Sequence, residues 1–292
     1  MRMFFRRMAV VLALSFSALL CGQGAATPIM PEKEGNHPSL TLELDWASKY
    51  VYNGVVFNNQ AVMLGDLCLE FQGLYVGAWG AYNLTHFQSR NGYVDDADGF
   101  YDSERKWRFE EANYYAGYYY TFDDTDGIGP LTIDFKWTYF HYPTMTENNS
   151  ADLQLSVSLD ELYKTERQCV SAKLTASYDY ELEETWVSLG GAYALALDDD
   201  GMFELVLNGD VYWGDAAYMR NWLDSAGNGF SFAVIGAALN VNLSEWFFIA
   251  PYVNASYALD GRVRDWTRRD EDYGRFNSRQ NFWGGLKANL SF

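Results

Sequence analysis

Long apolar runs are scarce in this sequence of 292 residues. Beyond the first 20 residues no apolar stretch reaches about 18 residues, the length that a membrane-spanning helix requires. The body of the chain is therefore not expected to cross a membrane as helices.

Basic side chains are also few, with 21 Lys and Arg against 39 Asp and Glu, which gives a formal net charge of −18. Three of the arginines lie in the first seven residues; without them, 18 basic side chains face 39 acidic ones, a charge of −21. Proteins that bind nucleic acid neutralise phosphates with Lys and Arg. The composition argues against nucleic acid as a partner and disfavours anionic surfaces and anionic solutes.

Cysteine and histidine are rare, with three residues of each. Cys68 is expected in the middle of a strand and Cys169 in a connection, and nothing in their placement suggests a disulfide, so we predict free thiols. The histidines, His37, His86 and His141, form no His-x-x-x-His motif, and there is no Cys-x-x-Cys. We therefore predict neither a metal site nor a cofactor.

The N-terminus is the one place where apolar residues cluster. Three arginines precede an apolar run at 8–20, and small residues follow at 24–26. This order predicts a secretory signal peptide over residues 1–26. A retained helical anchor is an alternative, and so is lipid attachment at Cys21, although the leucine before it is larger than such sites normally take.

Aromatic residues are abundant, at 17% of the chain, with 22 Tyr and 10 Trp. They accompany segments of about ten residues in which apolar and polar side chains alternate, the pattern of strands that cross a bilayer as a β-barrel. In the first segment Leu42 and Leu44 share one face, and Glu43 and Asp45 share the other. The alternating segments number twelve: 40–50, 62–71, 74–84, 111–122, 130–142, 151–160, 170–181, 185–197, 202–214, 229–243, 246–259 and 280–292.

The fold class is therefore predicted as all-β, a transmembrane antiparallel up-and-down β-barrel of 12 strands after a cleaved signal peptide. Short and long connections alternate along the chain, which predicts short periplasmic turns on one rim and long extracellular loops on the other. Two connections break this rhythm: the one near 161–169 should be short, and the one near 182–184 should be long. The expected divisions are a signal peptide, a short periplasmic segment and an outer-membrane barrel, residues 1–26, 27–38 and 39–292.

In such a barrel the apolar face meets lipid and the polar face lines the lumen. Ten acids and three bases on polar faces would be costly to bury in a dry core, so we expect a wet, acidic lumen. The expected lumen residues are Glu43, Asp45, Asp66, Glu70, Trp79, Asp134, Lys136, Asp152, Lys173, Asp179, Glu181, Glu204, Asp210 and Lys287. Twelve strands leave room for a narrow pore or a plugged one.

The chain ends in NFWGGLKANLSF, an alternating strand whose apolar face carries Leu286, Ala288, Leu290 and Phe292. Chain ends usually fray in water, but a closing strand of a barrel is held by pairing with the first strand. A terminal Phe on such a strand resembles the sorting signal that barrel-insertion machinery recognises in outer-membrane proteins.

The stretch DWASKYVYNGVVFNNQAVMLGDLCLEFQGLYVGAWGAYNL, residues 45–84, resembles the TorF-type porin family of bacterial outer-membrane barrels. Asn53 stands where the family commonly has Arg. Residues 138–143 (TYFHYP), SLDEL at 158–162 and the stretch 174–195 are similar to later family motifs. The residues that match the opening motif are Ser48, Lys49, Tyr50, Val51, Tyr52 and Gly54. The resemblance implies a barrel and a channel without an established substrate, and Asn53 weakens any role for a basic residue at its position.

Three other features have plain structural interpretations. The acidic segments 94–104 and 122–129 do not fit the EF-hand spacing, so solvated turns are favoured over weak calcium sites. The mixed-charge segment 262–275 predicts a salt-bridged loop over the mouth, and divalent cations bridging it to lipopolysaccharide phosphates is the alternative.

A tyrosine-rich segment follows at 114–120. Alternation puts Tyr114, Tyr118 and Tyr120 on one face and Tyr115 and Tyr119 on the other. Anchoring in an interfacial aromatic girdle is expected for this segment, and an aromatic slide for sugars is the alternative.

The sequence predicts a passive outer-membrane channel for small hydrophilic solutes, selective for cations because of its acidic lumen. Outer-membrane lipid and the insertion machinery are the expected partners. The alternatives are a non-conducting barrel with a structural or adhesive role through its long loops, and a soluble secreted β protein. A rim hydrolase using His86, or His141 with Ser150, has no supporting motif, so we expect no enzyme.

Overall fold

The computed structural model describes residues 37–85, 88–89, 92–93, 108–123, 129–143, 149–268 and 276–292. The expected signal peptide, Cys21, His86, the segment 94–104 and most of the segment 122–129 lie outside this range. No helix in the described ranges is long and apolar enough to cross a bilayer.

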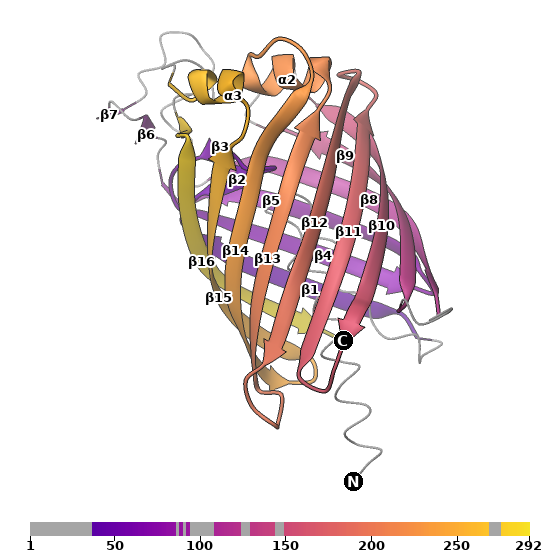
Figure 1. Ribbon diagram of the computed structural model, residues 1–292. Coiled ribbons are helices and arrows are strands. Elements are labelled where there is room, and N and C mark those ends of the chain that lie inside the picture. Colours follow the sequence, from indigo (N-terminus) through magenta and orange to yellow (C-terminus); the bar gives the residue numbers. More distant parts are fainter. Residues whose placement is uncertain are drawn as a thin grey trace.

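Twelve of the described strands form one closed antiparallel barrel, in which β1 is hydrogen-bonded to both β4 and β16. Around the barrel the strands follow chain order, which is the up-and-down topology (Figure 1). The barrel strands are β1 (Ser39–Ala47), β4 (Val62–Phe71), β5 (Leu74–Asn83), β8 (Phe109–Phe122), β9 (Leu131–His141), β10 (Ser150–Lys164), β11 (Gln168–Asp179), β12 (Glu184–Ala196), β13 (Phe203–Gly214), β14 (Gly229–Ser244), β15 (Phe247–Ala258) and β16 (Gln280–Ser291).

All twelve strands predicted from alternation are confirmed, and one of the two irregular connections is explained. Strand β10 runs on to Lys164 and β11 begins at Gln168, so the connection expected near 161–169 is a short turn at 165–167. A register shift between Leu159 and Tyr163 interrupts the alternation there and hid the end of β10. The connection after β11 spans only 180–183 and is short on a rim of long loops.

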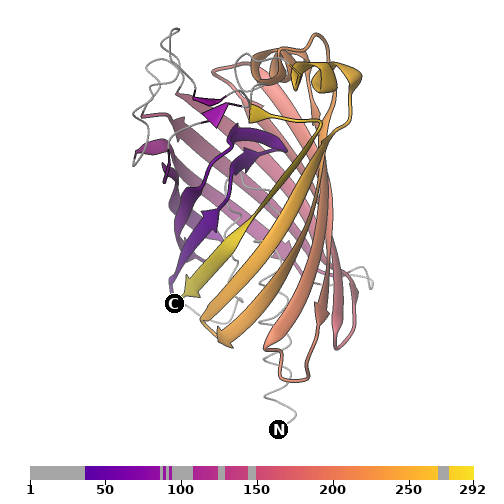
Figure 2. The same ribbon diagram turned by 90° about the vertical axis from the view of Figure 1, so that its left-hand side faces the viewer.

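The two rims differ in their connections. The terminal rim carries the start of β1, the end of β16 and the five connections between strands at 72–73, 123–130, 165–167, 197–202 and 245–246. The capped rim carries the helices α2 (Ala216–Leu223) and α3 (Gly261–Trp266), the hairpin of β2 (Tyr50–Tyr52) and β3 (Val55–Asn58), and the small pair β6 (Gln88–Ser89) and β7 (Gly92–Tyr93). Figures 1 and 2 show α2 and α3 lying across this rim, with the C-terminus at the opposite end.

The barrel wall is apolar outside and polar inside. Large apolar side chains such as Leu69, Val76 and Leu189 are about half exposed on the outer surface, whereas their neighbours Glu70, Tyr75 and Ser188, which carry polar groups, are buried inside. In a soluble barrel the distribution would be the reverse. This distribution is that of a transmembrane β-barrel, whose outer surface meets lipid.

The final strand closes the barrel. Residues 41–47 of β1 pair with residues 285–291 of β16. Beyond the ladder, the Leu40 N–H donates to the Phe292 carbonyl oxygen at 3.0 Å, and the Phe292 N–H donates to the Leu40 carbonyl at 2.9 Å. The Phe292 ring stacks on Trp246, with centroids 6.2 Å apart. These contacts hold the chain end, as predicted from the alternation; the role in sorting stays a prediction.

Both cysteines in the described residues are buried and free, which confirms the expected thiols. The expected place of Cys169 was wrong. Cys169 lies in β11 and packs inside the barrel against Ala192, Ala194 and Val206, because β11 begins at Gln168, one residue before it.

Candidate functional site

The barrel interior holds the residues predicted to line the lumen. Lys173 and Lys287 are partly exposed there, and the others are buried on inward-facing strand positions. Glu181 is the exception: it lies in the 180–183 turn, is exposed and does not line the interior, because β11 ends at Asp179. Three acids missed by the prediction are also buried, Glu110 and Glu111 on β8 and Glu184 on β12, and Glu110 accepts from Asn58 Nδ2 of the hairpin at 3.4 Å. All three stand near strand ends, where boundaries are least certain.

Tyrosine hydroxyls satisfy many of the interior carboxylates. Tyr75 donates to Asp134 Oδ1 at 2.7 Å, Tyr115 donates to Asp66 Oδ1 at 2.9 Å, and Tyr119 donates to Glu70 Oε1 at 3.2 Å. On the strands beyond β4, Tyr252 of β15 donates to Asp45 Oδ2 of β1 at 2.8 Å. A hydrogen bond from a hydroxyl to a carboxylate is stronger than one between two neutral groups. They let the wall carry acids without an equal number of bases.

The structure confirms that the tyrosines at 114–120 of β8 divide between the outer and inner faces of the wall. Tyr114, Tyr118 and Tyr120 are about half exposed on the outer face, where an aromatic girdle is expected. Tyr115 and Tyr119 point inward to the acids named above.

Two glycines make room for this arrangement. A Cβ on Gly77 would lie 2.2 Å from the Tyr115 ring, and one on Gly117 would lie 2.3 Å from the Tyr75 ring. Gly77 is the cross-strand partner of Tyr115, as Gly117 is of Tyr75. Each ring therefore lies flat against the wall over a residue without a side chain, which leaves its hydroxyl directed along the wall to an acid.

The interior bases are few and placed beside acids. Lys287 Nζ lies 2.8 Å from Glu43 Oε1. Lys173 and Asp210 stand in one row of the sheet, two strands apart, because Lys173 pairs with Gly190 and Gly190 pairs with Asp210. Among the described residues Glu204 has no basic partner, and it accepts from Asn240 Nδ2 at 2.8 Å. The interior thus keeps an excess of carboxylates.

The loop between β1 and β4 folds into the barrel. It forms the β2–β3 hairpin, in which Val51, Val55 and Val56 are at most 1% exposed. The figures show this hairpin curling inward below the capped rim (Figure 2). The hairpin turns at Asn53 and Gly54, which have φ values of 49° and 84°. Two consecutive positive φ values are typical of the type I′ turn that Asn-Gly favours.

Hydrogen bonds tie the hairpin to the wall on the side of β15 and β16. The Val56 N–H donates to Asn277 Oδ1 at 2.8 Å, and Asn277 Nδ2 donates back to the Val56 carbonyl at 3.0 Å. Ser256 Oγ donates to the Gly54 carbonyl at 2.9 Å. These bonds satisfy backbone groups that would otherwise be buried without partners.

Aromatic packing holds the hairpin on the remaining sides. Tyr50 lies 5.6 Å from Trp79 between ring centroids, and Tyr50 also donates to Glu111 Oε2 at 2.6 Å. Further around the barrel, Tyr52 lies 6.3 Å from the Trp186 ring. The hairpin is therefore a packed plug in the capped half of the interior. Neither its pairing nor its inward fold was predicted, although Asn53-Gly54 between β-branched residues was the available signal.

Asn53 is the residue that departs from the TorF-type motif, in which Arg is common at this position. Asn53 is 3% exposed and lies at the turn of the plug with positive φ. Asn adopts this conformation more readily than most residues.

Helices α2 and α3 cover the plug. Met219 and Leu223 of α2 are fully buried, as is Val263 of α3, and Trp266 is 2% exposed. Burial of the Tyr218 phenol, also on α2, raises its pKa. Phe57 of the hairpin lies 5.5 Å from the Trp222 ring of α2, so the cap and the plug pack as one unit.

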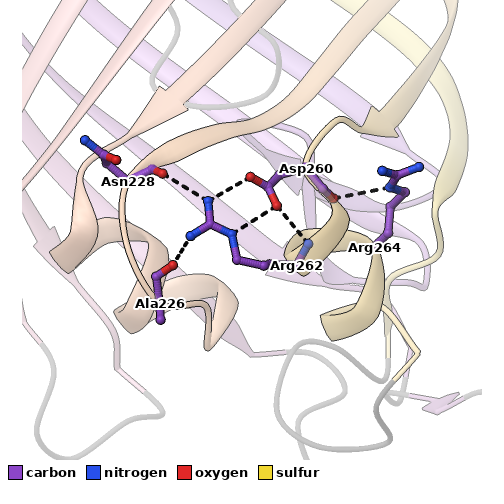
Figure 3. Close-up of polar contacts among 5 residues, drawn as sticks. All are labelled: Ala226, Asn228, Asp260, Arg262 and Arg264. Atoms are coloured by element: carbon purple, nitrogen blue, oxygen red, sulfur yellow. Dashed lines mark hydrogen bonds and ion pairs between the residues drawn. The ribbon is translucent and has the colours of Figure 1, made fainter.

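Arg262 of α3 connects this helix to the segment that follows α2 (Figure 3). Its guanidinium donates to Asp260 Oδ2 at 2.8 Å, to the Asn228 carbonyl at 3.0 Å and to the Ala226 carbonyl. The side-chain hydrogen bond from Arg262 lowers the pKa of Asp260. With Arg268 Nη1 3.2 Å from Asp265 Oδ1, these contacts are those of the predicted salt-bridged loop; residues 269–275 lie outside the described chain.

The structure does not support the suggested His141–Ser150 pair. Ser150 is buried and pairs with Phe140, which faces inward, whereas His141 follows Phe140 and occupies the opposite face of β9. The His141 Nδ1 lies 3.0 Å from Asn149 Oδ1. The two side chains therefore stand on different sides of the wall.

No known protein family and no curated protein sequence matches this chain. Solved structures with similar folds include the NanC porin, at 9% identity and a TM-score of 0.46 over 86% of this chain and 98% of that one. An outer membrane channel from Pseudomonas putida F1 has 11% identity and a TM-score of 0.49 over 90% and 100%. The KdgM porin has 10% identity and a TM-score of 0.42 over 87% and 99%. Likeness at this level concerns the fold only.

Proposed function

We propose that this protein is an outer-membrane channel for small hydrophilic solutes that favours cations. The observation that carries the proposal is a closed transmembrane barrel whose polar interior holds many more carboxylates than bases. An excess of fixed negative charge in a narrow low-dielectric passage raises the local concentration of cations and lowers that of anions.

In this proposal the β2–β3 hairpin is the constriction. It fills the capped half of the interior, which corresponds to the extracellular side because long loops face outward in outer-membrane barrels. Export through a signal peptide of residues 1–26 and a short periplasmic segment over 27–38 belong to the same proposal. Outer-membrane lipid, the insertion machinery that would recognise the strand ending in Phe292, and membership of the TorF-type porins are further parts of it.

The proposal is tested by ion selectivity in planar bilayers. The variant carries Glu43→Gln, Asp45→Asn, Glu204→Gln and Asp210→Asn, and current is recorded in a tenfold KCl gradient. We expect the cation-selective reversal potential of the native protein to move toward zero, because four interior carboxylates become neutral.

A matched control neutralises four exposed acids on the turns, Glu166→Gln, Glu181→Gln, Glu183→Gln and Asp200→Asn, and should leave the reversal potential nearly unchanged. An unchanged potential in the interior variant, with steady conductance, would contradict the cation selectivity.

The second candidate is a non-conducting barrel with a structural or adhesive role. It is favoured by the burial of nearly all interior acids and by the packed hairpin, which together leave little open space. Folded native protein that leaves the bilayer sealed, even when the hairpin is removed, would favour this candidate.

A further inference from the structure

A concave groove lies on the outer surface of the wall, over strands β1, β4, β5 and β8 and the end of β9. Its volume is ≈ 1070 Å³. Most of its lining comes from outward-facing strand positions, such as Leu44 of β1, Leu67 of β4 and Ala78 of β5, all of which alternate with buried residues. The groove therefore opens to the lipid side of the wall.

Small residues form the floor of the groove. Gly65 pairs with Gly80, and Gly80 pairs with Ala112, so three neighbouring strands carry small outward-facing residues in one row. The nearest described neighbour of a Cβ on Gly65 would be 3.6 Å away, so this part of the floor has room for a ligand. The inward-facing residues Asp66 and Trp79 also contribute to the lining, because the two glycines leave the backbone bare beside them.

Aromatic rings bound the groove toward the capped rim. The Phe109 ring lies over Gly80, since a Cβ there would be 3.1 Å from Phe109 Cε1. Tyr82 packs edge-on against Phe109, with ring centroids 5.2 Å apart. Tyrosines on the outer surface of membrane proteins are concentrated at the level of the lipid headgroups. This end of the groove therefore lies at the membrane interface, and the other end lies in the hydrocarbon.

The groove is short enough to belong to one leaflet. From Met63 to Leu67 it follows β4 for about 13 Å, at about 3.3 Å per residue. One leaflet holds half of the hydrocarbon core, roughly 15 Å. Because the groove lies toward the capped rim, where the long loops are, the leaflet is the outer one.

A basic side chain lies at the interfacial end. Arg108 is exposed, directly precedes β8 and lines the groove. Its carbonyl accepts from the Asn83 N–H at 2.9 Å, which extends the β5–β8 ladder and fixes the backbone of Arg108 there. Guanidinium groups bind phosphate through charge-assisted hydrogen bonds. On a chain of net charge −18, an arginine above an apolar groove matches the arrangement of a lipid with an anionic headgroup above its acyl chains.

We propose that this groove binds one lipopolysaccharide molecule of the outer leaflet. An acyl chain of lipid A, the membrane anchor of lipopolysaccharide, lies over Gly65 and Gly80, and a lipid A phosphate contacts Arg108. The proposal rests on the barrel's place in an outer membrane and on the assignment of the capped rim to the extracellular side. It does not rest on ion conduction, so a sealed bilayer in the conductance test would leave it standing.

Native mass spectrometry of the folded barrel in detergent counts the lipids that each barrel retains. The native protein is titrated separately with lipid A, with dephosphorylated lipid A and with phosphatidylglycerol. We expect one lipid A per barrel to bind at least about tenfold more tightly than either of the other lipids. Equal affinities for lipid A and its dephosphorylated form would overturn the proposal, and so would equal or tighter binding of phosphatidylglycerol.

Gly65→Leu tests the floor of the groove. The added side chain fills the space over Gly65, so lipid A should bind about tenfold more weakly. Gly209→Leu is the matched control, because Gly209 is an outward-facing residue of β13, away from the groove, where a Cβ would also be 3.6 Å from its nearest described neighbour. It should bind lipid A like the native protein. Undiminished binding in Gly65→Leu would overturn the proposal. A native mass of two copies that Gly65→Leu reduces to one would also overturn it, by assigning the groove to a second copy of the chain.

Arg108→Gln tests the phosphate contact. It should weaken the binding of lipid A about tenfold and leave that of dephosphorylated lipid A unchanged, because only the charge-assisted hydrogen bonds are lost. Arg279→Gln is its control, since Arg279 is exposed and directly precedes β16 at the same rim. Lipid A affinity equal to the native value in Arg108→Gln would contradict the proposal. If Gly65→Leu does not fold, Arg108→Gln and the lipid series on the native protein still decide.

Discussion

The two halves of the barrel interior are filled in different ways. In the capped half, Val51, Val55 and Val56 come from a hairpin that is not part of the wall, and they pack among Trp and Tyr rings as in a soluble protein core. Toward the terminal rim the wall itself supplies the contents, as in the pairs Tyr75–Asp134 and Asn240–Glu204.

In the proposed channel, constriction and ion selectivity would therefore belong to different segments. The plug packs through apolar side chains. Its removal would leave the wall ladder intact, because Ala47 and Val62 at the ends of β1 and β4 are already cross-strand partners. The acids and tyrosines belong to the wall, so their charge would persist in an unplugged barrel. Variants in the two halves should therefore have separable effects.

The largest effect on stability is expected for Gly54→Ala, in the plug. Gly54 has a φ of 84°, and a Cβ there would lie 2.5 Å from the Phe232 Cβ. A left-handed conformation and overpacking cost about 1–2 and 1–3 kcal/mol, so we expect a loss of about 2–5 kcal/mol. Urea unfolding followed by Trp fluorescence measures it.

The control for that change is Gly65→Ala in β4. A Cβ at Gly65 would lie 3.6 Å from its nearest neighbour, Leu44 Cδ2, which is an ordinary contact distance. The free energy of unfolding of this variant should therefore lie within about 0.5–1 kcal/mol of the native value. A Gly54→Ala variant as stable as Gly65→Ala would show that the hairpin does not pack as described.

A smaller effect is expected in the wall, from Tyr115→Phe. The change removes the hydroxyl that donates to Asp66, which is 6% exposed, so a buried carboxylate loses a partner. We expect a loss of about 1–3 kcal/mol in unfolding free energy. Tyr114→Phe, one residue away and 52% exposed on the outer surface, should change it by less than about 0.5 kcal/mol. Equal effects of the two variants would contradict the inward assignment of Tyr115.

The smallest effect is expected at the cap, from the titration of Asp260. Its pKa is lowered in the folded state by Arg262. This carboxylate therefore contributes stability above its unfolded pKa of about 3.9, and the contribution is lost as the pH falls through the folded pKa. The protection factors of the α3 amides against hydrogen exchange should fall below about pH 4 in the native protein more than in Asp260→Asn. A pH dependence identical in both proteins would exclude this contribution.

The sequence predicted the wall well because a period of two is imposed wherever one face meets lipid and the other does not. Each of the twelve strands carries that signal on its own. Where a bulge interrupts the period, as between Leu159 and Tyr163, the end of β10 was misplaced. Glu181 was assigned to the interior for another reason: the alternation was extended past Asp179, where β11 ends.

The plug escaped prediction because its residues obey a different rule. Val51, Val55, Val56 and Phe57 are buried on both sides, so the hairpin shows no alternation of apolar and polar residues. Its position depends on contacts with Phe232 and Asn277, which lie about 180 and 220 residues away in the chain. Nothing local in the sequence indicates those contacts.

The central claim is that the β2–β3 hairpin constricts an acidic channel. The most direct test replaces residues 48–61 by Asn-Gly, which joins the paired residues Ala47 and Val62 by a two-residue turn. Single-channel current of this variant and of the native protein is recorded in a tenfold KCl gradient. We predict that the variant conducts at least about tenfold more than the native protein and keeps a cation-selective reversal potential. A folded variant that conducts no more than the native protein, or that conducts without cation selectivity, would contradict the claim.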